Sequence, residues 1–179
     1  MSDTFSNLRH ALCDFDEWAS TFADRRNSDW PTDYPATGEL VYAASSAMRL
    51  ASDGSVASDE ELLLIARVWT LTEEPESMVE EAIAIGAAVG PVLRRLFAVG
   101  DWEARWQIVS VVPRLGVPDV DLIEWGTRDA HAYVRRRAWL ALHEVSGPLA
   151  IERAIHALES EPDGDLRRVL TQIVAGGAL

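Results

Sequence analysis

A repeated helical pattern constrains the fold of this chain more than any other feature of its sequence. The segment VRRRAWLAL (134–142) aligns with ARWQIVSVV (104–112), with LRRVLTQIV (166–174) and, more weakly, with VEEAIAIGA (79–87). Each segment begins with an apolar or small residue, has another four residues on, and has a small or apolar pair seven and eight residues on. The starts are 25, 30 and 32 residues apart. This spacing is typical of helical-hairpin repeats, which stack to bury a continuous core.

The remaining sequence also favours helices. No alternating apolar–polar run or Asn-Gly hairpin turn indicates a strand, whereas residues 3–26 carry apolar side chains at spacings of three and four. Ser58 with Glu61 resembles a capping box, and Pro91 and Pro148 each suit a first helical turn. The sequence therefore predicts an all-α fold of about ten helices. The expected helices are residues 3–26, 38–51, 59–72, 76–89, 91–99, 101–115, 119–127, 131–145, 148–160 and 163–175.

The stretch DAHAYVRRRAWLAL (129–142) resembles the second helix of a HEAT repeat, which opens with Asp, then a Val-Arg pair, then small apolar residues. The resemblance is good over 118–146, fair over 90–116 and 147–177, and weak over 59–89. It implies an armadillo-type fold, a right-handed α-α superhelix, with an N-terminal helical cap at 1–57 and HEAT-like repeats at 58–179 in one continuous domain. An acid precedes the second repeat position by six residues, as in Asp129 to Arg135, Glu161 to Arg167 and Glu74 to Glu80.

The helical register separates the three consecutive arginines. At about 100° per residue, Val134, Ala138 and Leu142 face the core. Arg135 then lies to one side, where the resemblance implies a structural contact with the acid of a turn, together with Asp129, Glu161 and Arg167 at the related positions. Arg137 lies to the other side, where the two alternatives are a bridge to the neighbouring repeat and a position in solvent. Arg136 points away from the core.

Transferring the outward positions between repeats predicts a concave strip for binding a partner. The expected strip is Trp102, Trp106, Val109, Arg136, Trp139, Leu140, His143 and Arg168. Tryptophan and arginine together are typical of interface hot spots. The alternative, in a tightly curved solenoid, is that these tryptophans pack on one another as core.

The charge distribution is uneven and bears on the partner. Residues 1–90 carry 17 acidic and 5 basic side chains, a net charge of −12, and residues 91–179 carry 12 and 11, a net charge of −1. The acidic half favours a basic partner and repels phosphate. All 16 basic residues are arginine, as expected for a GC-rich bacterial genome, and Cys13 is the only cysteine. The apolar run 82–93 is too short to span a bilayer, which needs about 20 residues. We therefore expect a cytoplasmic, acidic protein with no membrane contact, cofactor or metal; oligomeric state is left open.

A second resemblance is to the alkylpurine DNA glycosylases built from HEAT-like repeats, over EWGTRDAHAYVRRRAW (124–139). It implies that Trp106 and Arg136 correspond to their tryptophan and phosphate-side arginine. Their catalytic aspartate follows a tryptophan by four residues, where WQIVS (106–110) has Ser110. No catalytic residue is therefore assigned. Nucleic-acid binding is disfavoured because good binders use about 6–10 cationic contacts.

The sequence thus leads to one main hypothesis and one alternative. The main hypothesis is a non-catalytic HEAT-like repeat protein that serves as a protein–protein interaction scaffold or adaptor, including an inhibitor or immunity-type binder of a basic partner. The alternative is a degenerate or active relative of the HEAT-like DNA glycosylases that binds nucleic acid. A HEAT-like chromophore lyase or its chaperone is a weaker third interpretation.

Overall fold

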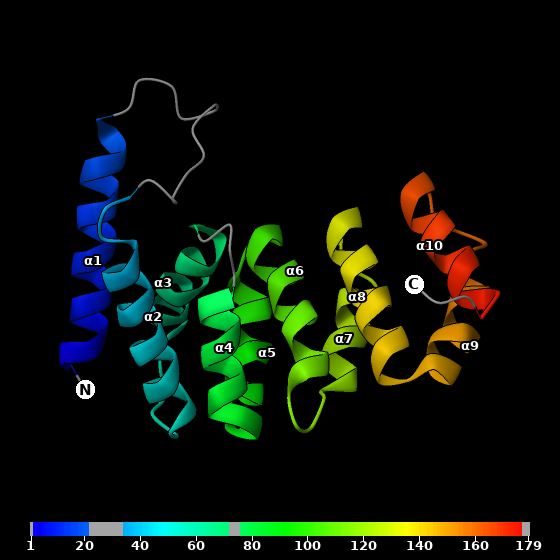
Figure 1. Ribbon diagram of the computed structural model, residues 1–179, viewed down its shortest axis with the longest axis horizontal. Helices are drawn as coiled ribbons and strands as arrows, with labels where there is room; N and C mark the ends of the chain where they lie inside the picture. The colour runs from blue at the N-terminus through cyan, green and yellow to red at the C-terminus, as the bar shows by residue number, and fades with distance from the viewer. Residues whose placement is uncertain (1, 22–33, 72–75, 177–179) are drawn as a thin grey trace. The chain divides into compact units, whose positions relative to one another are not determined.

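The computed structural model describes residues 2–21, 34–71 and 76–176. Every regular element in these ranges is a helix and none is a strand, so the described chain is all-α, as the sequence predicts (Figure 1). The chain forms two compact units, Met1–Ala104 (unit 1) and Arg105–Leu179 (unit 2). The division falls inside helix α6 (Trp102–Val111), whereas the boundary expected after residue 57 lies within unit 1.

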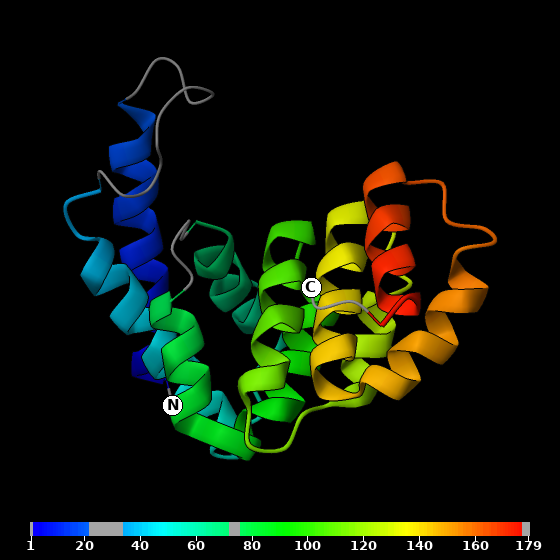
Figure 2. The same ribbon diagram turned by 45° about the vertical axis from the view of Figure 1, so that its right-hand side comes forward.

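Unit 1 is built on the apolar stripe of its first helix. Its elements are α1 (Ser2–Ser20), α2 (Thr37–Ser52), α3 (Asp59–Leu71), α4 (Glu76–Ile85), the 3-10 helix η1 (Gly86–Val89) and α5 (Gly90–Val99). Helices α1 and α2 lie side by side (Figures 1 and 2), and α3 packs on α2 and α5. The α1 side chains Phe5, Leu8, Leu12, Phe15 and Ala19 are buried. The expected end of this helix, residues 22–26, lies outside the described residues.

A helical stretch in unit 1, Met78–Val99, is long and apolar enough to cross a membrane by length and composition, with a mean hydropathy of 1.6 over its best window. The stretch is interrupted. Helix α4 ends at Ile85, earlier than the expected residue 89, because Gly86 takes a positive φ of 72° that favours glycine, and a 3-10 turn follows. Val89, Leu93 and Leu96 are fully buried. Over the best window of this stretch, however, only 33% is buried, so its burial is partial.

Unit 2 contains the remaining repeats. Its elements are the rest of α6, the 3-10 turn η2 (Val112–Arg114), α7 (Val120–Gly126), α8 (Ala132–Val145), α9 (Gly147–Ala157) and α10 (Gly164–Val174). Helix α8 packs on α7, α9 and α10, and α9 packs on α10. The core of unit 2 includes Ile108, Leu122, Leu142, Leu166 and Ile173, which are all fully buried.

Local signals account for most helix ends. The capping box forms reciprocally, since the Ser58 N–H donates to Glu61 Oε2 at 2.8 Å and the Glu61 N–H donates to Ser58 Oγ at 3.2 Å. Asp119 and Asp163 cap α7 and α10 by accepting the N–H three residues on. The helix expected over 101–115 ends earlier, at Val111, because Pro113 replaces its last turn with a 3-10 turn.

Candidate protein-interaction surface

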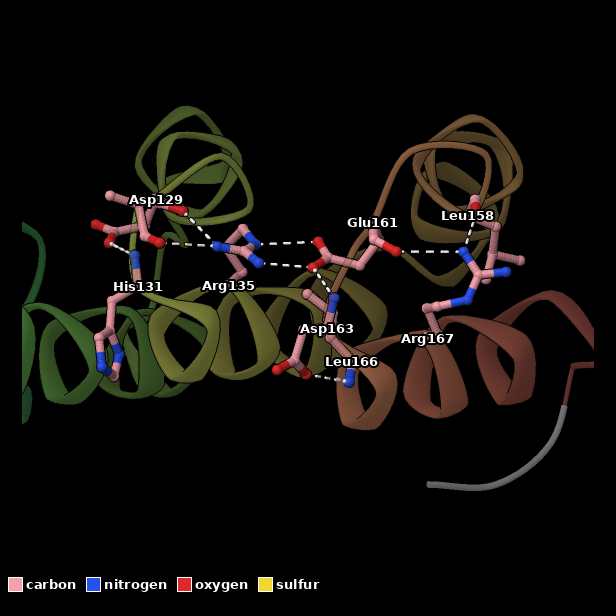
Figure 3. Close-up of polar contacts among 9 residues, drawn as sticks. Asp129, His131, Arg135, Leu158, Glu161, Asp163, Leu166 and Arg167 are labelled. Atoms are coloured by element: carbon pink, nitrogen blue, oxygen red, sulfur yellow. Dashed lines mark hydrogen bonds and ion pairs between the residues drawn. The ribbon is translucent and has the colours of Figure 1, made fainter.

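Arg135 on α8 is used by the scaffold. Its Nε and Nη2 donate to the Glu161 carboxylate at 3.0 and 2.6 Å (Figure 3). Its Nη1 donates to the backbone carbonyls of Asp129 and Ala130, both at 3.0 Å. The Arg135 and Glu161 side chains are only 14% and 8% exposed. Because all three nitrogens of this guanidinium have acceptors inside the protein, Arg135 is a structural group.

The same ion pair occurs one repeat earlier. Arg105 Nε and Nη2 donate to the Asp129 carboxylate at 2.7 and 3.2 Å. Position 105 aligns with 135 in the repeated pattern, and Asp129 occupies the same place before Arg135 as Glu161 does before Arg167. The carboxylate at this position therefore pairs with the arginine of the preceding repeat.

The turns that hold the two acids are also alike. Asp129 accepts the His131 N–H at 2.8 Å, and Glu161 accepts the Asp163 N–H at 3.0 Å, so each acid closes a turn two residues on. The arginine six residues after each acid donates to the acid's backbone carbonyl; Arg167 does so to Glu161 at 3.2 Å. The expected link between an acid and the arginine six residues later thus runs through the backbone. We call Arg105, Asp129, Arg135, Glu161 and Arg167 the ladder.

The electrostatics of the ladder keep its central pair charged. Burial of the Glu161 carboxyl acts to raise its pKa, but hydrogen bonds from Arg135 and the Asp163 N–H outweigh burial and hold the pKa below its usual value. The hydrogen bond to Glu161 raises the pKa of Arg135 above its usual value, against the effect of burial. Both side chains are therefore ionised at neutral pH.

The next two arginines have a different environment. Arg136 lies over the Tyr133 ring, with its Cζ 4.7 Å from the ring centroid, and Arg137 lies over Trp106 at 5.1 Å and near Tyr133 at 5.8 Å. The Trp106 and Tyr133 rings meet edge to face, 5.4 Å apart. All four side chains are half-buried. We call these four residues the aromatic–arginine surface.

Neither arginine of this surface has a carboxylate partner among residues 2–21, 34–71 and 76–176. Within that part of the chain the buried Nε of Arg137 also has no hydrogen-bond partner. Arg137 borders a hollow of about 180 Å³ that Ser110, Leu140 and Glu144 also line. Because this Nε is buried, the capacity of the two arginines to bind an incoming group lies in their Nη atoms.

Two members of the expected strip lie in the core instead of on the surface. Val109 is fully buried and Trp139 is 4% exposed. Gly126 explains the position of Val109, because a Cβ at residue 126 would lie 2.9 Å from Val109 Cγ1 and 2.8 Å from Ala138 Cβ. The end of α7 therefore approaches α6 and α8 closely, and Val109 fills this contact.

The other expected strip residues are at least partly accessible. Trp102, one turn before Trp106 on α6, is 37% exposed, and Leu140 and His143 are half-buried. Arg168 is exposed and pairs with Asp165 of its own helix. The structure therefore brings Trp106 together with Arg137, which the sequence left undecided, and places Arg136 on Tyr133, which the strip did not include.

Tyr133 is the residue that the sequence reasoning missed. It precedes Arg136 and Arg137 by three and four residues, the spacing at which helical side chains are neighbours. That spacing was the available signal.

The structure also places the residues relevant to the glycosylase resemblance. The Ser110 hydroxyl donates to the Trp106 carbonyl of its own helix at 2.7 Å. Asp101, which is nearby in sequence, accepts the Ala104 N–H at 3.0 Å and the Thr70 hydroxyl at 2.9 Å, which is a helix-capping arrangement.

Comparisons of the chain with protein-family models, with curated proteins and with solved structures found no match.

Proposed function

We propose that this chain is a non-catalytic, HEAT-like helical-repeat protein that binds another protein, as a scaffold, adaptor or inhibitor, through the aromatic–arginine surface. One observation carries the proposal: Arg136 and Arg137 are stacked on Tyr133 and Trp106 without a carboxylate partner in the described residues. Tryptophan, tyrosine and arginine are the residue types enriched in interface hot spots.

The ladder supports the repeat part of this proposal. Arg105 and Arg135 make equivalent ion pairs, and Asp129 and Glu161 close equivalent turns. Stacked repeats are stabilised by contacts between neighbouring units, and the ladder is a contact of this kind that follows the sequence register. The proposed superhelix is right-handed, as the HEAT resemblance implies.

The chemistry of the surface indicates what a partner presents to it. A guanidinium without an acceptor favours carboxylate or carbonyl oxygens, and flat rings favour apolar or aromatic side chains. We therefore infer a contact segment that places an acidic or carbonyl group over Arg136 and an apolar group beside Trp106. A partner that is basic overall is compatible with such a segment, because the segment is local.

The test is quantitative capture from a cell extract with tagged protein. Trp106→Ala and Arg136→Ala are compared with Arg128→Ala, which removes an exposed arginine whose ion pair to Glu124 is long, at 3.9 Å. Proteins retained by the wild type and Arg128→Ala should be depleted about tenfold by Arg136→Ala, the loss of one hot-spot side chain. Equal retention by all three folded variants would overturn the proposal.

The nucleic-acid alternative is separated by titrating labelled duplex DNA at low and physiological salt. Two unpaired arginines are fewer than the phosphate contacts that a stable complex uses. We expect binding at low salt at most, lost near 150 mM salt. DNA binding that persists there and depends on Arg136 would favour the alternative.

A further inference from the structure

A long groove runs along α2 in unit 1, and its chemistry differs from that of the aromatic–arginine surface. A hollow of about 620 Å³ lies between α1 and α2, with Asp14, Tyr34, Glu39 and Tyr42 in its lining. A second hollow of about 410 Å³ shares Thr4, Tyr42 and Ser46 with the first and continues toward Asp53. The first hollow alone has the size of a ligand pocket, about 300–1,000 Å³.

The groove is acidic. Among the residues that the structure describes, its lining includes the carboxylates of Asp14, Glu39, Asp53 and Glu81 and a single arginine, Arg49. Arg49 is already paired with Glu81, and His10 is 3.6 Å from Asp14. Glu39 and Asp53 have no cationic partner in the described ranges. The described part of the lining therefore carries negative charge that no described cation compensates.

Tyr34 lies in the lining close enough to Asp14 and Glu39 to be affected by their charges. Burial raises the pKa of this phenol, and the negative charges of Asp14 and Glu39 raise it further. Burial disfavours any charge, so only the contribution of Asp14 and Glu39 has the sign of a site that attracts a cation.

Tyr42 is the aromatic element of the groove. It is 74% exposed, and it lines both hollows, so it lies where they join. An exposed ring beside carboxylates provides a cation–π contact for an arginine or lysine side chain. The flanking helix surface, with Ser45 and Ser46, is small and polar and leaves room for a backbone.

From the groove, its charge and Tyr42, we infer that unit 1 docks an arginine- or lysine-rich segment of a partner protein, laid along α2 with one cationic side chain over Tyr42 and another between Asp14 and Glu39. The complementary charge selects this occupant over an apolar or acidic peptide. The inference does not depend on the aromatic–arginine surface, so either can fail without the other.

The experiment measures fluorescence anisotropy of a labelled Gly-Arg repeat peptide with the full chain at low and physiological salt. A Gly-Glu repeat peptide of equal length is the negative probe. The expected result is saturable binding of the arginine peptide, weakened by salt because the contacts are solvent-accessible, and none of the glutamate peptide.

Two variants locate the binding. Asp14→Asn with Glu39→Gln should weaken binding about tenfold, while Glu17→Gln with Glu60→Gln, which changes the net charge equally at exposed positions outside the groove, should weaken it less than about twofold. Tyr42→Leu should weaken binding about threefold and Tyr42→Phe should restore it, because the phenyl ring keeps the cation–π contact.

Several results would overturn the inference. One is the absence of saturable binding by the wild type, and another is an equal loss of peptide affinity in the two charge-changing double variants. A third is unchanged affinity in Tyr42→Leu. Because Tyr42 is exposed, this variant still tests the inference if Asp14→Asn with Glu39→Gln unfolds. A dimer that dissociates in Tyr42→Leu, seen by analytical ultracentrifugation, would instead assign the groove to a second copy of the chain.

Discussion

Helix α8 carries two kinds of arginine one residue apart, and the contrast separates structure from recognition. Arg135 has acceptors for all three nitrogens and is 14% exposed. Arg136 and Arg137 have aromatic rings under their guanidinium groups and no carboxylate among the described residues. The difference follows from 100° steps of the helix, which direct one arginine to the next turn and the others to Trp106 and Tyr133. A run of like charges therefore need not form one patch.

The largest expected effect is on the ladder. Glu161→Gln removes the charge that Arg135 pairs with and leaves the Arg135 Nε donor facing an amide N–H, so we expect a loss of about 2–3 kcal/mol in the free energy of unfolding. Urea denaturation measures it. Asp165→Asn removes the exposed partner of Arg168 and should cost less than about 0.5 kcal/mol. Similar losses in both variants would remove the distinction between buried and exposed pairs.

The second effect concerns the close approach of α7 that buries Val109. Gly126→Ala places a methyl group within 3 Å of Val109 and Ala138. We expect this clash to lower the free energy of unfolding by about 1–3 kcal/mol. Gly164→Ala is the matched control, since a Cβ there meets nothing within 4 Å. A neutral Gly126→Ala would show that α7 can move away, and that Val109 does not need this contact.

A third prediction uses pH to isolate the ladder. The folded-state pKa of Glu161 is lowered, so its contribution is fully present above its unfolded pKa and is lost as the pH falls through the folded value. The stability difference between wild type and Glu161→Gln should therefore be constant from pH 7 to about 5 and shrink below about 4.5. A difference that persists unchanged to pH 2 would mean that charge is not its origin.

The smallest effect is expected at the aromatic–arginine surface. Arg136→Ala removes a stacked but unpaired cation and should change the free energy of unfolding by less than about 0.5–1 kcal/mol, the value of a half-exposed cation–π contact. Thermal unfolding of Arg136→Ala and of Glu161→Gln, measured side by side, compares Arg136 with the partner of the neighbouring Arg135. A loss as large as that of Glu161→Gln would assign Arg136 to the scaffold.

The sequence predicts the direction of side chains here better than their depth. Apolar spacing, the Ser58 capping box and the prolines predict the helices to within a few residues, and the register separates Arg135 from the other two arginines. Arg136 and Arg137, which the register sends in different directions, both lie near Tyr133. The sequence does not predict the burial of Val109, and it leaves open whether Trp139 lies on the surface or in the core. A helical register gives an angle for each residue, but depth depends on how closely the next helix packs, and at Val109 this depends on Gly126.

The ladder shows a second limit. The sequence contains the acids and arginines at a regular spacing, yet the partner of each carboxylate is set by three-dimensional packing. Asp129 pairs with Arg105, 24 residues earlier, and Glu161 with Arg135, 26 residues earlier. Neither pair is the six-residue pair that the sequence displays, which is completed through the backbone carbonyl.

The central claim is that the surface around Arg136 and Arg137 is where a partner protein binds. Site-specific photo-crosslinking tests it most directly, with benzoylphenylalanine at Leu140, which borders the Arg137 hollow, and at Val117, which is 70% exposed, as the control. The account predicts that the captured partner becomes covalently attached at position 140 and not at position 117. Attachment at position 117 alone, or equally at both, would contradict it.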